Sequence, residues 1–228
     1  MQTIYTPKGR ALEYSPLALN LHRGCSHACT YCYAPAATFT KPDDFYNNVI
    51  PRKGILKALK KTAPQFKGKE VLLCFTSDPY QPIEKELRIT REAIKILQDN
   101  DIAVNILTKG ALLAERDFDL LRPGIDKFGV TLTFTCANQS REYEPFANAP
   151  IYRMEVLREA HQRGLYTWVS LEPVIKPECS IRIIHATHTY VDEYKIGKWN
   201  HKKEANKINW RQFLSQASSV LNKYGKKY

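Results

Sequence analysis

Apolar segments with the length of strands alternate with segments of helical spacing along the 228-residue chain, and this alternation constrains the fold most. A short apolar run bounded by polar turns is typical of a buried strand, whereas apolar residues three and four positions apart are typical of a helix. The expected strands are Leu17–His22, Val71–Phe75, Val104–Thr108, Phe128–Phe134, Thr167–Leu171 and Val191–Ile196. The expected helices are Gly54–Thr62, Arg88–Asn100, Glu115–Leu121, Ile151–Arg163, Glu178–Ala186 and Ile208–Tyr224.

Repeated strand–helix units require parallel strands that are joined by right-handed crossovers. Six such units are fewer than the eight of a closed barrel, so we expect an α/β fold, a partial, open (βα)6 barrel of parallel strands. The length suits one domain over residues 1–228, with a core of about 15–200 and a C-terminal helix of about 208–224 packed on it. The basic end, Lys223–Tyr228, is expected to fray. Functional residues should gather where the strands end.

The net charge of +11 and the pI near 9.3 favour an anionic partner such as a nucleic acid or nucleotide, although basic proteins with other partners are common. The basic stretch Lys195–Lys203 contains Trp199, whose ring either stacks on a base or packs the mouth of the barrel. No apolar run is long enough to cross a bilayer, and the N-terminus lacks a secretory signal. We therefore expect a cytoplasmic protein without a membrane partner.

Three of the six cysteines, Cys25, Cys29 and Cys32, lie in one loop directly after the first expected strand. Clustered cysteines in a reducing compartment are more often metal ligands than disulfides. Structural zinc takes four ligands, so His22 or His27 would have to supply the fourth. Three thiolates on a [4Fe–4S] cluster instead leave one iron open to a substrate or cofactor.

The C-x3-C-x2-C spacing resembles the signature of the radical S-adenosylmethionine (radical SAM) superfamily. Tyr31 and Tyr33, which flank Cys32, and the stretch CFTSDPYQPIEKELRITREAI from Cys74 to Ile94 resemble its spore photoproduct lyase branch, a DNA repair photolyase type. The resemblance covers about residues 15–200. It implies that the three cysteines hold a [4Fe–4S] cluster, that S-adenosylmethionine chelates the open iron, and that one electron cleaves it to a 5′-deoxyadenosyl radical, which abstracts hydrogen from a substrate.

The resemblance also implies roles for a cysteine and two tyrosines. Cys74 matches a cysteine that returns a hydrogen atom to the substrate, and Tyr31 and Tyr33 match tyrosines that help to relay it. Cys136, which follows the fourth expected strand, is the alternative donor. Cys74 as a small apolar residue of a buried strand is the structural alternative, because free cysteine is among the most buried residue types.

Further residues match contacts to the cofactor. Ser77 and Asp78 resemble the position that contacts the methionyl amino group, and Lys109 resembles a lysine that pairs with the methionyl carboxylate. Thr131 or Thr133 is expected to hydrogen-bond the same carboxylate or the ribose.

Two glutamates that precede prolines, Glu144 and Glu172, are the other candidates. Glu172 ends the fifth expected strand and is interpreted as a contact to cofactor or substrate, whereas Glu144 is interpreted as a loop residue.

The expected function is therefore a radical SAM enzyme that abstracts hydrogen from a substrate, which we expect to be a nucleic acid or nucleotide, with flavodoxin or ferredoxin as electron donor. Two alternatives stay open. One is radical SAM modification of a peptide or small metabolite, and the other is a zinc-stabilised nucleic-acid-binding module without catalysis. Spore photoproduct lyases are longer than this chain, and a fold does not transfer a substrate.

Overall fold

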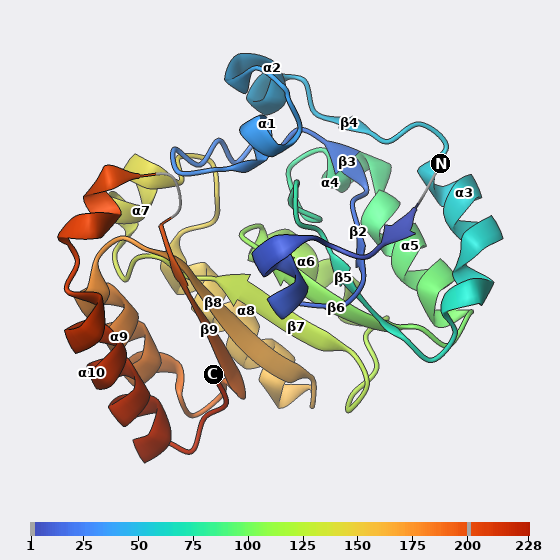
Figure 1. Ribbon diagram of the computed structural model, residues 1–228. Coiled ribbons are helices and arrows are strands. Elements are labelled where there is room, and N and C mark those ends of the chain that lie inside the picture. The colour runs from blue at the N-terminus through green and yellow to red at the C-terminus, as the bar shows by residue number, and fades with distance from the viewer. Residues whose placement is uncertain (1–2, 200–201) are drawn as a thin grey trace.

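The computed structural model describes residues 3–199 and 202–228. Its centre is a seven-stranded sheet in the order β1-β2-β5-β6-β7-β8-β9 (Figure 1). β1 is antiparallel to β2, and every later pair of neighbours is parallel. The strands are β1 Ile4–Tyr5, β2 Ala18–Leu19, β5 Glu70–Leu73, β6 Ala103–Thr108, β7 Lys127–Thr131, β8 Tyr166–Val174 and β9 Glu193–Lys198.

The parallel strands follow one another in chain order, as they must when each strand is joined to the next by one crossover. In the described part of the chain the sheet begins at β1 and ends at β9, and it does not close on itself. The α/β open-barrel expectation is thereby confirmed.

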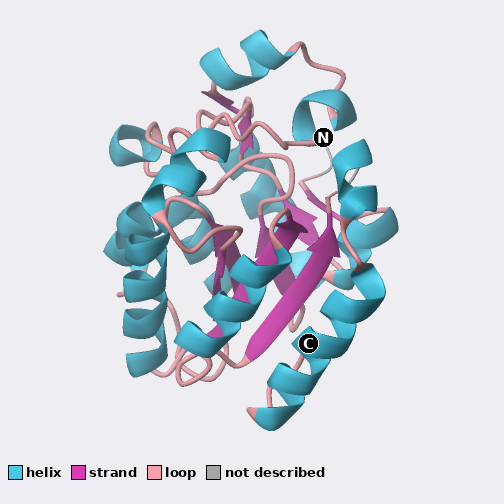
Figure 2. Ribbon diagram, turned by 90° about the vertical axis from the view of Figure 1, so that its left-hand side faces the viewer, coloured by secondary structure: helices cyan, strands magenta, loops and turns pink. Residues whose placement is uncertain are grey.

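Helices surround the curved sheet on its outer side (Figure 2). The crossover helices are α3 Ile55–Thr62, α5 Ile89–Gln98, α6 Ala111–Ala114, α8 Pro150–Gln162 and α9 Pro177–Thr187, and α10 Trp210–Lys223 follows the last strand. α10 lies along α9, where the rings of Tyr224 and His188 stack with centroids 3.8 Å apart. The loops carry the shorter helices α1 Ala34–Ala37, α2 Pro42–Asn47, α4 Glu84–Leu87 and α7 Ala137–Tyr143.

Trp168 on β8 fills the interior of the barrel. Its side chain is 1% exposed, and its indole N–H donates to Asn105 Oδ1 on β6 at 2.9 Å. Between them, β7 carries Gly129, where a Cβ atom would lie 2.4 Å from the indole ring. Glycine is needed at this position because the indole occupies the space of a side chain.

The first expected strand, Leu17–His22, is interrupted. Only Ala18–Leu19 pairs in the main sheet, and His22–Arg23 form β3, which is antiparallel to β4 at Ile50–Pro51. Between them, the side chain of Asn20 accepts hydrogen bonds from the backbone N–H groups of Phe75 and Thr76 at 2.9 and 3.1 Å. A side-chain amide thus replaces the backbone partner that a continuous strand would supply.

The expected helix Glu115–Leu121 is wrong in position. The helical residues are Ala111–Ala114, and a short 3-10 turn, η3, follows at Glu115–Asp117. The buried Asp117 carboxylate pairs with Arg116 at 2.9 Å and with Arg91 at 3.1 Å. These contacts stabilise a tight turn where local propensity alone predicts a longer helix.

The C-terminal residues do not fray as expected. Tyr194 N–H donates to the carbonyl of Lys227 at 2.8 Å, and Lys227 Nζ lies 3.3 Å from Glu193 Oε2. These residues therefore cover part of the exposed edge of β9, whose backbone groups would otherwise face water.

The first described residues, 3–15, form a segment that we call the strap. β1 pairs with β2 at one end of the sheet, and the 3-10 helix η1, Gly9–Glu13, then passes in front of the sheet (Figure 1). At the other end, Lys195 Nζ on β9 donates to the carbonyl of Glu13 at 3.0 Å. The strap thus links the two ends of the open sheet.

Among the described residues, no helix is both long and apolar enough to cross a membrane.

Candidate active site

A cavity of about 370 Å³ lies at the carboxyl ends of the parallel strands. This is the edge at which α/β folds place their functional residues. The expected site residues that line it are Cys25, Cys29, Tyr31, Cys32, Tyr33, Cys74, Ser77, Asp78, Lys109, Thr131 and Glu172. Lining residues that the sequence did not single out include Lys8, Tyr14 and Ser170.

The three clustered cysteines lie on residues 24–33, which we call the cysteine loop. Gly24 begins it with a φ of +80°, and a Cβ atom there would lie 2.5 Å from the carbonyl oxygen of Phe45. Cys25 N–H donates to that carbonyl at 3.0 Å, and Cys32 N–H donates to the carbonyl of Cys29 at 3.0 Å. The backbone itself therefore brings the three thiols to one side of the cavity.

The thiols are protonated when no metal holds them. Burial raises the pKa of Cys29 to about 12, and it also raises the pKa of Cys25 and of Cys32. Because iron binds thiolates, binding of a cluster would displace these protons.

The donor set fits a cluster better than a single ion. In residues 3–199 and 202–228, no three His, Cys, Asp or Glu side chains converge as one metal ion requires. A [4Fe–4S] cluster makes no such demand, since each thiolate binds a different iron.

The two histidines considered as a fourth zinc ligand have other partners. His22 Nε2 lies 2.9 Å from Glu84 Oε1, with both side chains fully buried. His27 Nε2 lies 3.3 Å from Asp78 Oδ2, and its Nδ1 lies 3.1 Å from the carbonyl of Phe146. The zinc hypothesis therefore finds no fourth ligand in either histidine.

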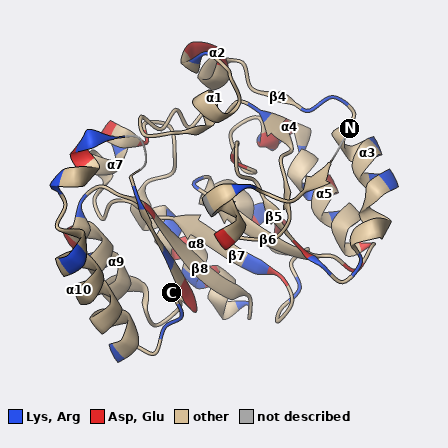
Figure 3. Ribbon diagram, viewed as in Figure 1, with Lys and Arg blue, Asp and Glu red and all other residues tan. Residues whose placement is uncertain are grey.

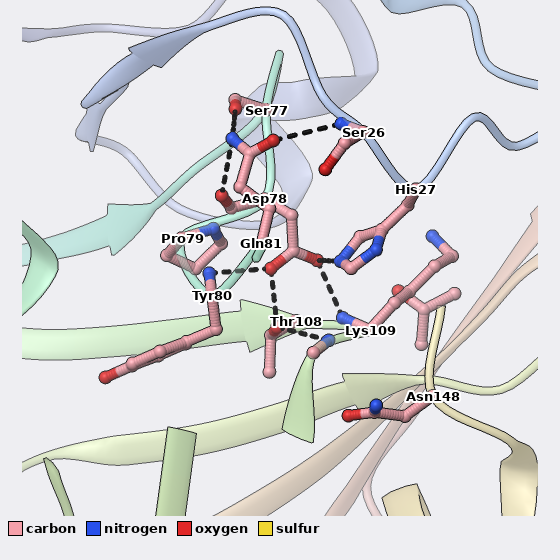
Figure 4. Close-up of polar contacts among 12 residues, drawn as sticks. Ser26, His27, Ser77, Asp78, Pro79, Tyr80, Gln81, Thr108, Lys109 and Asn148 are labelled. Atoms are coloured by element: carbon pink, nitrogen blue, oxygen red, sulfur yellow. Dashed lines mark hydrogen bonds and ion pairs between the residues drawn. The ribbon is translucent and has the colours of Figure 1, made fainter. Parts of the chain in front are cut away.

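Asp78 joins three segments of the site (Figure 4). Its Oδ1 accepts hydrogen bonds from Thr108 Oγ1 at 2.6 Å and from Tyr80 N at 2.8 Å, and its Oδ2 accepts one from Lys109 N at 2.7 Å. Burial alone would raise the pKa of Asp78, but His27 and these hydrogen bonds hold that pKa well below its usual value. The ionised carboxylate thus ties the end of β6 and the loop after β5 to the cysteine loop.

Ser77 and Gln81 make a second connection to the cysteine loop (Figure 4). Ser77 Oγ donates to the carbonyl of Gly24 at 2.7 Å and accepts from Gln81 Nε2 at 2.9 Å. Gln81, which is fully buried, also accepts from Ser26 N at 3.0 Å. Gln81 was missed in the sequence, although it lies within the stretch that carries the family resemblance.

Lys109 and the two threonines occupy different depths. Lys109 lines the cavity with its Nζ 5.5 Å from the centre of the Tyr31 ring. Burial opposes its charge, but Cys29 and Glu144 raise the pKa of Lys109. Thr131 lines the cavity, whereas Thr133 lies beneath Tyr31, with its Oγ1 3.4 Å from the phenol oxygen.

Cys74 and Tyr33 lie on the same wall. Cys74 follows β5 directly, and the Tyr33 hydroxyl donates to the carbonyl of the next residue, Phe75, at 3.1 Å. Burial raises the pKa of Cys74 to about 12, so its thiol keeps its hydrogen at neutral pH. Cys74 is 5% exposed and also belongs to the apolar core, whereas Cys136 is exposed just before α7.

The hydrogen-bond partner of Tyr31 lies in the loop after α7. The Tyr31 hydroxyl donates to the carboxylate of Glu144, which is 2% exposed. Glu144 does lie in a loop, at the end of α7, but it is a buried partner of the cysteine loop rather than a solvated loop residue. No local sequence signal distinguishes it from other glutamates.

Another part of the cavity wall is built around Glu172. Its carboxylate accepts a hydrogen bond from the Tyr14 hydroxyl, which also lies 3.0 Å from Ser170 Oγ. Gly197 on β9 makes room for Glu172, since a Cβ atom at Gly197 would lie 1.5 Å from Glu172 Oε1. Glu172 therefore reaches the cavity as expected, with a strap residue as its partner.

The basic stretch Lys195–Lys203, which begins within β9, reaches the cavity in part. Lys198 and Trp199 line it, and Lys202 Nζ lies 6.0 Å from the centre of the Trp199 ring. Residues 200–201 of this stretch lie outside the described residues. Figure 3 shows the lysines and arginines spread over the helices and strand ends, and they do not gather in one region of the molecule.

The sequence profile of the radical SAM superfamily matches residues 19–180, from β2 to the first turn of α9. The chain belongs to the radical SAM superfamily.

The chain is also similar to several curated proteins described as uncharacterized. One from Methanocaldococcus jannaschii is 27% identical over 179 residues, which cover 77% of this chain and 67% of the relative. One from Mycobacterium tuberculosis is 28% identical over 74% of this chain and 52% of the relative. One from Acidianus two-tailed virus is 31% identical over 70% of this chain and 56% of the relative. The chain thus spans about half to two thirds of these relatives.

Solved structures share the fold. A tyrosine-to-phenylalanine variant of spore photoproduct lyase superposes with a TM-score of 0.74 at 12% identity, over 97% of this chain and 76% of that chain. A variant of the same lyase with bound S-adenosylmethionine and dinucleoside spore photoproduct superposes with a TM-score of 0.68 at 15% identity. The match covers 95% of this chain and 64% of that chain. SuiB from Streptococcus suis, bound to S-adenosylmethionine, superposes with a TM-score of 0.64 at 11% identity, over 90% of this chain and 47% of that chain. The fold is therefore of the spore photoproduct lyase type.

Proposed function

We propose that this chain is a radical SAM enzyme whose cysteines Cys25, Cys29 and Cys32 hold a [4Fe–4S] cluster beside bound S-adenosylmethionine. One observation carries the proposal: the three thiols and Cys74 line the same cavity at the carboxyl ends of the strands. When bound, the cluster supplies the single electron that cleaves S-adenosylmethionine to a 5′-deoxyadenosyl radical.

Residues of the same cavity bind the cofactor in this proposal. Lys109 pairs with the methionyl carboxylate, since it is a half-buried cation on the cavity wall. Ser77 and Asp78 face the methionyl amino group, and Asp78 also holds Lys109 through its backbone N–H. Thr131 hydrogen-bonds the ribose or the carboxylate; Thr133 supports Tyr31 instead.

Cys74 is the hydrogen-atom donor that completes the reaction on the substrate. Its thiol is protonated and lines the cavity, which a donor of a hydrogen atom requires. Tyr33 is 47% exposed, and its hydroxyl donates a hydrogen bond to the carbonyl of Phe75, the residue after Cys74. Tyr33 therefore relays the hydrogen atom beside Cys74 in this proposal. Tyr31 joins the relay only if its hydrogen bond to Glu144 opens.

The proposed substrate is a nucleotide or nucleic acid. Trp199 offers a ring for stacking beside Lys198, and Lys8 adds a second cation at the cavity. The net charge of +11 also suits an acidic electron carrier such as flavodoxin or ferredoxin. A peptide or small metabolite is the second candidate, because the basic residues are not gathered in one region of the molecule as seen in Figure 3.

The test is anaerobic reconstitution with iron and sulfide, followed by dithionite and S-adenosylmethionine. A brown protein that forms 5′-deoxyadenosine supports the proposal, and an iron-loaded protein that forms none with DNA, RNA or nucleotides present contradicts it. Cys74→Ala should stop product formation from an identified substrate but still cleave the cofactor. Cys136→Ala, at an exposed cysteine outside the cavity, is the matched control and should keep full activity.

A further inference from the structure

The cysteine loop rests on residues 143–148, which join α7 to α8 and which we call the platform. Thr30 N–H donates to the carbonyl of Tyr143 at 2.9 Å. Phe146 N–H donates to the carbonyl of His27 at 3.4 Å, and the carbonyl of Phe146 lies 3.1 Å from His27 Nδ1. The platform therefore holds the backbone of the loop on both sides of Cys29.

Glu144 is the platform residue that reaches the side chains of the loop. One carboxylate oxygen, Oε1, accepts the hydrogen bond from the Tyr31 hydroxyl. The other, Oε2, accepts from Ser140 Oγ at 3.0 Å and from Arg153 Nη2 at 2.6 Å. A phenol that donates to an ionised carboxylate makes one of the stronger hydrogen bonds in proteins.

Arg153 anchors this arrangement to the barrel. Its side chain is fully buried, and its guanidinium donates to the carbonyl of Thr131 on β7 at 2.8 Å and to that of Asn148 at 2.7 Å. A buried ion pair contributes little net stability because both charges lose their hydration. Its role here is to orient the carboxylate: Arg153 holds Glu144 Oε2, and the other oxygen, Oε1, accepts the hydrogen bond from Tyr31.

We propose that Glu144 is a positioning residue, which through Tyr31 holds the turn from Cys29 to Cys32 in the conformation that receives the cluster. Tyr31 lies between these two cysteines in the chain, so a displaced ring moves both thiols. The identity of what the turn binds rests on the proposed function, whereas the hold on the turn is a property of the chain itself.

The test uses the full chain without iron and measures the exposure of individual thiols. N-ethylmaleimide modifies the protein under native conditions, and mass spectrometry of peptides gives the rate at each cysteine. Tyr31→Phe should raise the rate at the buried Cys29 by about tenfold or more, the effect of losing one hydrogen bond to a charged group. The rate at the exposed Cys136 should stay constant and serves as the internal reference.

A double-variant experiment on Glu144 and Tyr31 distinguishes a positioning role of Glu144 from a general structural role. Glu144→Gln should also raise the Cys29 rate, but in the Tyr31→Phe background it should add less than about twofold. Additive effects in the double variant, or an unchanged Cys29 rate in Tyr31→Phe, overturn the proposal. Glu144→Gln leaves Arg153 without its partner and can lower the stability of the whole fold. In that case the double variant Glu144→Gln with Arg153→Met replaces Glu144→Gln in the same experiment. Additive effects with Tyr31→Phe, or an unchanged Cys29 rate in Tyr31→Phe, again overturn the proposal.

Tyr166→Phe is the matched control. It removes another phenol that donates to a carboxylate, that of Glu193 at 3.0 Å. Tyr166 is the first residue of β8, whereas the cavity lies at the carboxyl end of the strand. The Cys29 rate of Tyr166→Phe should stay within about twofold of the unmodified chain, and an equal rise in both variants contradicts the proposal.

A second measurement adds the cluster. After reconstitution, Tyr31→Phe should lose iron to a chelator about tenfold faster than the unmodified chain, and an equal rate of loss contradicts the positioning role. If the unmodified chain takes up no iron, the proposed function fails, and the thiol rates still decide whether Glu144 holds the turn.

Discussion

The hydroxyl of Tyr14, in the strap, donates a hydrogen bond to the carboxylate of Glu172 at the end of β8. The Tyr14 ring lies between those of Phe75 and Trp168, with centroids 6.0 and 5.8 Å away. Tyr14 lies outside residues 19–180, the segment that matches the superfamily profile. The strap, which the family profile does not include, thus contributes Tyr14 to the part of the cavity wall around Glu172.

Tyr14→Phe should loosen the strap without unfolding the barrel. The ring keeps its aromatic neighbours, and the loss of one hydrogen bond to a charged group should lower the free energy of unfolding by about 1.5–3 kcal/mol. Limited proteolysis within residues 6–13 should become faster. Tyr228→Phe, at an exposed phenol that donates to Asn222 Oδ1 at 3.3 Å, is the control. It should change neither the free energy of unfolding nor the rate of proteolysis in the strap. Unchanged proteolysis in Tyr14→Phe would show that the strap is held by other contacts.

Lys109→Met should weaken binding of S-adenosylmethionine to the reconstituted protein. The variant keeps much of the apolar stem but loses the cation that faces the methionyl carboxylate, so the dissociation constant should rise by roughly ten- to a hundredfold. Isothermal titration calorimetry under anaerobic conditions measures it. Lys67→Met, whose side chain is 75% exposed, should bind as the unmodified chain does. Equal affinity in Lys109→Met removes this residue from the cofactor site.

Asp78→Asn should destabilise the protein through the junction of three segments. The amide nitrogen cannot accept the hydrogen bonds that one carboxylate oxygen accepts, so the free energy of unfolding should fall by about 2–4 kcal/mol. Asp119→Asn is the control, since Asp119 pairs with Arg91 at 2.6 Å but is 57% exposed, and it should cost less than about 1 kcal/mol. Urea unfolding compares them. An equal loss in both variants would mean that the Asp78 junction is no stronger than a surface pair.

Glu193 should make the stability depend on pH in the acid range. Burial alone would raise the pKa of Glu193, but Lys195 and Lys227, with Nζ atoms 3.2 and 3.3 Å away, hold that pKa below its ordinary value. Its contribution is therefore present above the unfolded pKa of about 4.3 and is lost as the pH falls through the lower folded value.

Between pH 5 and 3 the unmodified chain should lose more stability than Glu193→Gln, by less than about 1 kcal/mol because both lysines reach solvent. Urea unfolding at each pH measures the difference, and Glu86→Gln, at an exposed glutamate, is the control. Parallel pH profiles for the unmodified chain and Glu193→Gln would contradict the assigned pKa shift.

The order of the parallel strands and the position of the cysteine loop were predictable from the sequence. Buried parallel strands such as β6 are mostly apolar, and amphipathic helices such as α5 carry their pattern in local spacing. The start of the helix near residue 111 was not predictable, because the buried Asp117 pairs with Arg91, which lies 26 positions away in the chain. The C-terminal pairing of Lys227 with β9 was missed for the same reason.

By itself the sequence determined an open barrel of parallel strands and three thiols after the first of them, since periodicity and spacing are local properties of a chain. Only the tertiary structure decided that Glu144 supports Tyr31, that Asp78 joins three loops, and that the strap supplies Tyr14 to Glu172. These contacts join residues that are 30 to 158 positions apart, and such pairs leave no periodic pattern. They form because folding brings the ends of the strands to one edge, where buried polar groups must find partners.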